Sequence, residues 1–224
     1  MIIDSKKIEW VRSNEILQPS LWDDITDALL ENLVETKEWI DQQREEWYVV
    51  AIVHLSWDMM HSSHVQYMNI IRAKLRKEIG RPFKLLVGVE ADSRTEDRKG
   101  KKNVQSQEER AYMFSNLKAV DKVYIEFEGV DEQTNDYRPA WIIQYLMPDV
   151  LVSHEEHIWS DEDKVRSQVK DKMGGELVVI HIGDEVKYLE EESMREKYNR
   201  STTNTIIQIL SMYKDHPKYN ALLT

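Results

Sequence analysis

YVVAIVHL, residues 48–55, decides the fold of this chain. The run is continuously apolar and rich in β-branched residues, which is typical of a strand that is covered on both faces. Apolar residues at helical spacing follow, from Val65 to Ile79, and Gly80 supplies a common helix stop. A second apolar run, FKLLVGVE, follows at residues 83–90. This strand–helix–strand order predicts two parallel strands joined by a right-handed crossover.

The same alternation continues along the rest of the chain. Further strands are predicted at residues 122–126, 149–152 and 176–181. Capping and first-turn signals predict helices at residues 106–118, 139–147 and 160–173, and from residue 202 onwards. Strands that alternate with helices predict an α/β fold, because each crossover helix covers one face of the sheet. We therefore expect a Rossmann-like parallel five-stranded sheet with helices on both faces, plus an N-terminal helical extension.

Residues 1–46 differ in pattern from the rest of the chain. Leu33 and Ile40 belong to an approximate apolar helix face, and many glutamates lie beside it. Such a face predicts a helix that docks on the body of the protein or on a partner chain. We expect a helical extension over residues 1–46 and one α/β domain over residues 47–224.

Composition excludes several classes of function. The net charge of −11 argues against a nucleic-acid partner, which needs clustered Lys and Arg. Cysteine is absent, so a metal must be held by histidine, by carboxylates or by substrate phosphates. No apolar run reaches the roughly 20 residues that span a bilayer, so no membrane contact is expected. The sequence MIIDSKKIEW at the N-terminus lacks the apolar stretch of a signal peptide, and we expect a cytoplasmic protein.

Two histidines follow the first predicted strand, at the edge of the sheet where parallel α/β folds bind ligands. The sequence there is SWDMMHSSH, residues 56–64, and His64 lies at the start of the next helix. His61 and His64 therefore lie at a helix N-terminus, where unpaired N–H groups and the helix dipole favour a phosphate. Two alternatives stay open: one histidine caps the helix while the other packs, or the pair contributes to a metal site.

Basic residues and hydroxyls appear at three later positions. RTEDRKGKKN, residues 94–103, is the densest positive stretch, although a solvated loop would look the same. Arg110 lies in the first turn of a predicted helix, where the dipole disfavours a cation, and this suggests an anion nearby. The sequence STT, residues 201–203, opens the last predicted helix with hydroxyls and N–H groups that suit a phosphate. An ordinary N-cap is the alternative there.

Taken in order, these segments resemble the cytidylyltransferase-like nucleotidyltransferase family, of the glycerol-3-phosphate cytidylyltransferase and ADP-heptose synthase nucleotidyltransferase domain type. The segments that carry the resemblance are WDMMHSSH at 57–64, LLVGVEAD at 85–92, KG at 99–100, EER at 108–110 with VD at 120–121, and STT at 201–203. The similarity covers roughly residues 47–212. It implies the same Rossmann-like fold for this part of the chain.

The resemblance also implies a set of site residues. It places His61 and His64 at the phosphates of the nucleotide, Lys99 near the substrate phosphate, and Arg110 as a phosphate ligand. Asp58 matches a residue that holds the turn rather than reacts. The other nucleotide-binding residues that it implies are Ser56, Trp57, Ser63, Ser201, Thr202 and Thr203, of which the last three belong around the β- and γ-phosphates.

This sequence departs from the family pattern in three places. Ser63 stands where the family has glycine before the second histidine, and Leu55 stands at another glycine position. A side chain at position 63 would crowd the base or ribose, because glycine permits close backbone approach. The acidic pair expected after the 149–152 strand is replaced by SHEEH, residues 153–157. A catalytically inactive nucleotide-binding homologue is therefore an open alternative.

The activity that the resemblance implies is transfer of a nucleotidyl group, with CMP from CTP favoured, to a phosphorylated alcohol or sugar. Pyrophosphate leaves, and Mg²⁺ that bridges the phosphates is the expected cofactor. An adenylyltransferase that uses ATP and acts on a sugar phosphate or nicotinamide mononucleotide is the close alternative. The resemblance further suggests a homodimer, to which the first 46 residues would contribute contacts.

Overall fold

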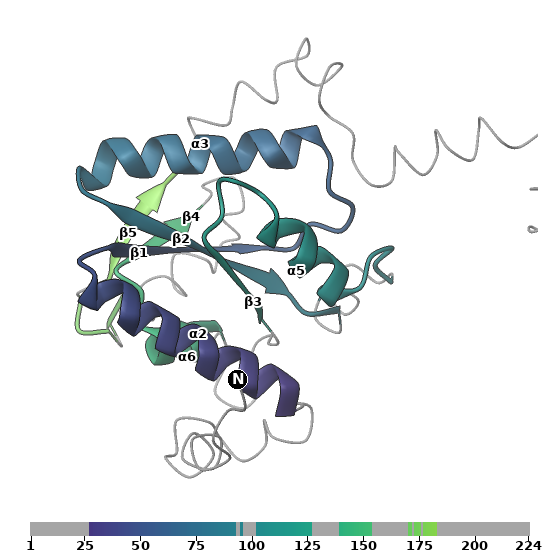
Figure 1. The fold of residues 1–224 in the computed structure, drawn as a ribbon, viewed down its shortest axis with the longest axis horizontal. Coiled ribbons are helices and arrows are strands. Elements are labelled where there is room, and N and C mark those ends of the chain that lie inside the picture. The colour runs from purple at the N-terminus through teal and green to yellow at the C-terminus, as the bar shows by residue number, and fades with distance from the viewer. Residues whose placement is uncertain are drawn as a thin grey trace, which may run out of the picture.

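The computed structural model describes residues 27–92, 95, 102–126, 139–153, 170–171, 173–175 and 177–182. These residues form a five-stranded, all-parallel sheet in the order β3-β2-β1-β4-β5. Helices lie on both faces of the sheet (Figure 1). The predicted fold class, with an N-terminal helix, is confirmed.

The strands and helices lie close to the predicted ranges. The strands are β1 (Val49–Leu55), β2 (Phe83–Glu90), β3 (Lys122–Glu126), β4 (Val150–Ser153) and β5 (Val178–His181). The helices are α2 (Asp27–Glu45), α3 (Ser62–Ile79), α5 (Gln107–Ser115) and α6 (Pro139–Leu146). The predicted helix at 160–173 falls almost entirely outside the described residues, and the one from 202 onwards falls wholly outside them.

Strand register brings the ends of β1, β2 and β3 to one edge of the sheet. Leu55, the last residue of β1, pairs with Val89 in β2, and Val89 pairs with Ile125 in β3. Residues that follow β1 and β2 therefore emerge side by side. This carboxyl edge is where parallel α/β sheets bind their ligands.

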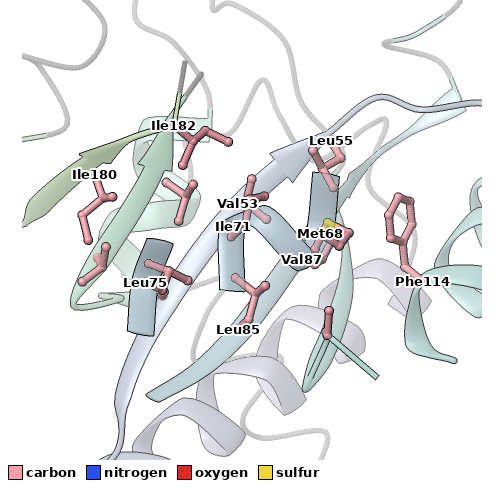
Figure 2. Close-up of a cluster of buried hydrophobic side chains, with 14 of the residues drawn as sticks. Val53, Leu55, Met68, Ile71, Leu75, Leu85, Val87, Phe114, Ile180 and Ile182 are labelled. Atoms are coloured by element: carbon pink, nitrogen blue, oxygen red, sulfur yellow. The ribbon is translucent and has the colours of Figure 1, made fainter. Parts of the chain in front are cut away.

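One face of the sheet is covered by α3 and α5. Met68, Ile71 and Leu75 of α3 are wholly buried, and Figure 2 shows them against the side chains of β1 and β2. Phe114 of α5 and Ile180 of β5 join the same cluster. Burial of each large apolar side chain contributes about 1.5–3 kcal/mol, so this cluster fixes α3 on the sheet.

The opposite face is covered by α2 and α6. Leu33 and Ile40 of α2 are wholly buried together with Ile142 of α6. The Asn32 side chain also accepts a hydrogen bond from the backbone N–H of Ile125 in β3, at 3.0 Å. The described part of the predicted extension thus shares one core with the sheet, and the boundary after residue 46 stays a prediction. None of the described helices is long and apolar enough to cross a membrane.

Three polar side chains meet on the α2 side of the sheet, across β2. Tyr124 Oη and His54 Nε2 lie 2.8 Å apart, and His54 Nδ1 lies 3.5 Å from a carboxylate oxygen of Glu126. Gly88 of β2 lies between them, where a Cβ would come within 2.7 Å of the His54 ring and 2.8 Å of the Tyr124 hydroxyl. Glycine at position 88 therefore leaves the room that the His54–Tyr124 contact occupies.

Gly88→Ala should destabilise the fold by about 1–3 kcal/mol, the usual cost of an atom forced into a packed core. Equilibrium unfolding in urea measures the change as a lower midpoint. Gly80→Ala is the control: nothing lies within 4 Å of its Cβ position, but its φ of +67° strains any side chain. We expect a smaller loss there, and a wild-type midpoint for Gly88→Ala would contradict the steric account.

Candidate functional site

His61 and His64 together form the start of α3. His61 is the N-cap residue, with extended backbone, and its carbonyl oxygen accepts from the backbone N–H of His64 at 3.0 Å. In return, the backbone N–H of His61 donates to His64 Nδ1 at 3.3 Å. The imidazole of His64 thus takes the part that glutamate plays in an ordinary capping box. Capping by a histidine, one of the open alternatives, is what the structure shows, and it places both rings at the helix N-terminus.

A column of aromatic rings holds these histidines. The ring of His64 stacks on His61 with centroids 3.7 Å apart, and on Trp57 at 4.1 Å. Trp57 in turn stacks on Phe114 of α5 at 5.5 Å, and Tyr67 meets it edge-on at 4.9 Å. Burial raises the pKa of Tyr67, so its phenol stays neutral at physiological pH. The column therefore fixes both imidazoles and ties the start of α3 to α5.

Asp58 makes a second link between the histidine turn and α5. Its carboxylate is 8% exposed and accepts from the backbone N–H of Val104, at 2.9 and 3.0 Å, and of Gln105, at 3.0 Å. These two residues lie just before the N-cap of α5, Ser106. Asp58 therefore holds the segment that leads into α5.

Arg110 of α5 carries a buried guanidinium. The residue is 1% exposed, and its Nη2 donates to Asp92 Oδ1 at 2.6 Å. Asp92 is thus one anion that offsets the unfavourable placement of the Arg110 charge in the first turn of a helix. The other two donors, Nε and Nη1, are buried and have no hydrogen-bond partner among the described residues. Since a buried donor without an acceptor is costly, the arrangement calls for a further acceptor, and a phosphate oxygen suits a guanidinium well.

Asp92 was missed as a functional candidate at the level of sequence, where it appeared only as the end of the LLVGVEAD segment. It follows β2 at the carboxyl edge of the sheet, and that position is the signal that points to it. Burial opposes its ionisation, but hydrogen bonds from Asn103, Arg110 and the backbone N–H of Gln107 outweigh burial and hold the pKa of Asp92 below its ordinary value. Asp92 is therefore a carboxylate at physiological pH.

The structure brings part of the predicted site together. Trp57, Asp58 and the two histidines lie in one turn, and the contacts described above join that turn to the helix of Arg110. Ser56 and Ser63 belong to the same stretch and are half-buried. The predicted residues that lie outside the described part of the chain are Lys99, Ser201, Thr202 and Thr203. Within the described part, no group of three or more histidine or acidic side chains is placed to hold a metal ion.

Comparison with known proteins identifies relatives of part of the chain. No family model matches. The bifunctional protein HldE of Helicobacter pylori strain P12 is 30% identical over 130 residues, which cover 58% of this chain and 23% of that protein. The bifunctional protein HldE of Wolinella succinogenes is 32% identical over 117 residues, which cover 52% of this chain and 21% of that protein. This chain is a distant homologue of HldE.

The homology is to the nucleotidyltransferase domain of HldE, and it confirms the resemblance that the sequence motifs indicate. The chain spans less than a quarter of the length of these two HldE proteins. Among solved structures, the lipopolysaccharide core biosynthesis protein from Thermoplasma volcanium GSS1 is 21% identical and superposes with a TM-score of 0.43. That match covers 59% of this chain and 94% of the other.

Proposed function

We propose that this chain is a nucleotidyltransferase that transfers CMP from CTP to a phosphorylated alcohol or sugar. Homology to the nucleotidyltransferase domain of HldE supports the reaction class. The observation that carries the proposal is the buried Arg110 guanidinium, whose Nε and Nη1 lack an acceptor among the described residues. Its helix is joined through the Trp57–Phe114 stack to the turn that bears His61 and His64.

The proposed chemistry needs few special groups. A phosphate oxygen of the acceptor attacks the α-phosphorus of the nucleotide, the bond from the α-phosphorus to the bridging oxygen breaks, and pyrophosphate leaves. Because the attacking phosphate is already an anion near neutral pH, no general base is required. The protein must offset the charge that builds on the phosphoryl oxygens and must hold attacker and leaving group in line.

The residues of the site suit that task. In the proposal, His61 and His64 at the N-terminus of α3 provide donors to the phosphates, and the guanidinium of Arg110 provides both donors and positive charge. Lys99 and the hydroxyls of Ser201, Thr202 and Thr203 are proposed as further phosphate contacts. Mg²⁺ would be held by the phosphate oxygens themselves, where it would neutralise charge on the leaving group.

Two alternative functions remain, and each predicts a different experimental result. An adenylyltransferase would use the same phosphate contacts with ATP, because none of them recognises the base. A catalytically inactive nucleotide-binding homologue is favoured by the side chains at Leu55 and Ser63, where the family has glycine. Leu55 is 7% exposed and belongs to the apolar cluster under α3, so its side chain is part of the core.

Thermal unfolding with each nucleoside triphosphate and Mg²⁺ tests the proposal. A nucleotide at 100 times its Kd stabilises by about 2.7 kcal/mol, which for a chain of this size raises the Tm by roughly 5–10 °C. We expect that shift with CTP and a smaller one with ATP. Pyrophosphate release should then require a phosphorylated acceptor such as glycerol 3-phosphate or a sugar phosphate.

Each alternative outcome has a meaning of its own. A larger shift with ATP, followed by pyrophosphate release, indicates the adenylyltransferase. A shift without release over a panel of phosphorylated alcohols and sugars indicates the inactive homologue. An unchanged Tm with every nucleoside triphosphate at millimolar concentration would rule out a nucleotide site.

A further inference from the structure

Asp92 joins three segments of the chain at the carboxyl edge of the sheet. Its Oδ1 accepts from Arg110 Nη2 at 2.6 Å and from Asn103 Nδ2 at 3.0 Å. Its Oδ2 accepts from the backbone N–H of Gln107 at 3.0 Å, and the Gln107 side chain accepts from the backbone N–H of Asp92 at 3.1 Å. One carboxylate therefore ties the end of β2, residue 103 and the first turn of α5 into one unit.

Arg110 depends on this carboxylate for its orientation. Within the described part of the chain, Asp92 is the only group that forms a hydrogen bond with the Arg110 side chain. An arginine side chain has many rotamers, and the positive end of the α5 dipole repels its charge. Arg110 is also closely packed, and within that packing the bond from Nη2 to Asp92 is the polar contact that orients Nε and Nη1.

We propose that Asp92 is a positioning residue, which fixes the Arg110 guanidinium so that Nε and Nη1 meet a phosphate group of the substrate. The proposal rests on the nucleotidyl transfer proposed above. It goes further, because Asp92 acts through Arg110 and through the start of α5 without touching the substrate. The lowered pKa of Asp92 means that its full charge is available to hold Arg110 at assay pH.

A second effect of Asp92 opposes the first. Its negative charge repels an incoming phosphate, so removal of the carboxylate also removes a repulsion. The Asp92 side chain is 32% exposed, and solvent and salt therefore screen that repulsion. The orientation of Arg110, which is 1% exposed, is a matter of geometry that salt does not screen. When Asp92 is removed, the effect of losing the Arg110 orientation should therefore exceed the effect of losing the repulsion. The difference should be clearer at higher salt.

Calorimetric binding of inorganic pyrophosphate with Mg²⁺ tests this role without any base or acceptor. Asp92→Ala should weaken pyrophosphate binding roughly tenfold, a moderate value for residues in one hydrogen-bond network. Asp92→Asn should bind with intermediate affinity, because its carbonyl oxygen can still accept from Arg110. In an Arg110→Met background, Asp92→Ala should weaken binding no further, since there is no guanidinium left to orient.

Asp121→Ala is the matched control. Asp121 also accepts from an arginine, Arg72 Nη1 at 2.7 Å, and from a backbone N–H, that of Leu85 at 2.8 Å. It precedes β3 and so lies at the amino edge of the sheet, opposite the candidate site. Its removal should cost stability and leave pyrophosphate binding at the wild-type level.

The outcomes separate the two proposals. Absence of pyrophosphate binding by the wild-type protein would overturn the proposed function and the positioning role with it. Wild-type binding combined with an unchanged affinity in Asp92→Ala would overturn only the positioning role. The positioning role would also be overturned if the losses of affinity in Asp92→Ala and Arg110→Met added up in the double variant. Additive losses show that Asp92 acts independently of Arg110. If Asp92→Ala does not fold, Asp92→Asn carries the same comparison, in the wild-type and the Arg110→Met backgrounds.

Discussion

Replacing His64 by alanine should lower the turnover of nucleotidyl transfer by roughly 10²–10³-fold, the usual cost of one lost donor to charge that develops in a transition state. The His64 ring lies in the first turn of α3, between His61 and Trp57. Its Nδ1 accepts from the backbone N–H of His61, so Nε2 is the ring nitrogen on the side away from that bond. We propose that Nε2 donates to the phosphates of the nucleotide.

Alanine at position 64 also removes the cap and the stack, so a second pair of variants separates catalysis from folding. His64→Asn carries an amide near the position of Nδ1, and it can still accept from the His61 N–H. His64→Gln carries an amide nearer the position of Nε2. Initial rates of pyrophosphate release should fall in the Asn variant while its Tm stays close to wild type, and should be partly restored in the Gln variant. Near-normal turnover of His64→Asn would contradict the role of Nε2.

Arg110→Met should show a second large effect, a loss of roughly 10²–10³-fold in kcat/KM together with a small change in stability. Methionine fills much of the same volume and brings no charge, so it removes both unpartnered donors from the interior. Asp92 loses one of its partners, but it is partly exposed and keeps the bonds from Asn103 and Gln107. We therefore expect a destabilisation of about 1 kcal/mol, well below the 3–5 kcal/mol that follows when a fully buried charge loses its partner.

Steady-state kinetics and urea unfolding of the same variant check this prediction. Arg72→Met is the control, because Arg72 also pairs with a carboxylate, that of Asp121, but at the amino edge of the sheet. Its kcat/KM should match wild type. A large loss of stability in Arg110→Met with unchanged kcat/KM would show that the buried guanidinium is a structural ion pair.

Local signals allowed the sequence to predict much of this fold. The β-branched run after residue 48 predicted β1, and Gly80 ends α3 with the left-handed backbone, φ +67°, expected of a helix stop. The capping box of Ser106 and Glu109 is formed with both hydrogen bonds, at 3.2 and 2.9 Å. The end of that helix was less well predicted. We expected residue 118, but the helix ends at Ser115 because Asn116 caps it with bonds to Met113 and Phe114.

The site was harder to predict from the sequence, because its decisive contacts join residues far apart in the chain. The sequence predicted an anion near Arg110, yet nothing local named Asp92, eighteen positions earlier. Likewise, the need for glycine at position 88 arises from the His54–Tyr124 contact across three strands. The histidine pair was predicted from its place after β1, whereas its stack with Trp57 and Phe114 depends on how α5 packs. Periodicity and capping describe neighbours in sequence, and they carry no information on such pairings.

The central claim is that one triphosphate binds where the histidine turn, Arg110 and the start of the last predicted helix converge. The most direct measurement is a crystal structure of the protein soaked with CTP, or with ATP if that nucleotide gives the larger thermal shift, and Mg²⁺. Our account predicts density for the triphosphate at the N-terminus of α3, with a phosphate oxygen within hydrogen-bond distance of Arg110 and with Lys99 and Ser201 beside it. A nucleotide bound elsewhere, or Arg110, Lys99 and Ser201 far from the 61–64 turn, would contradict it.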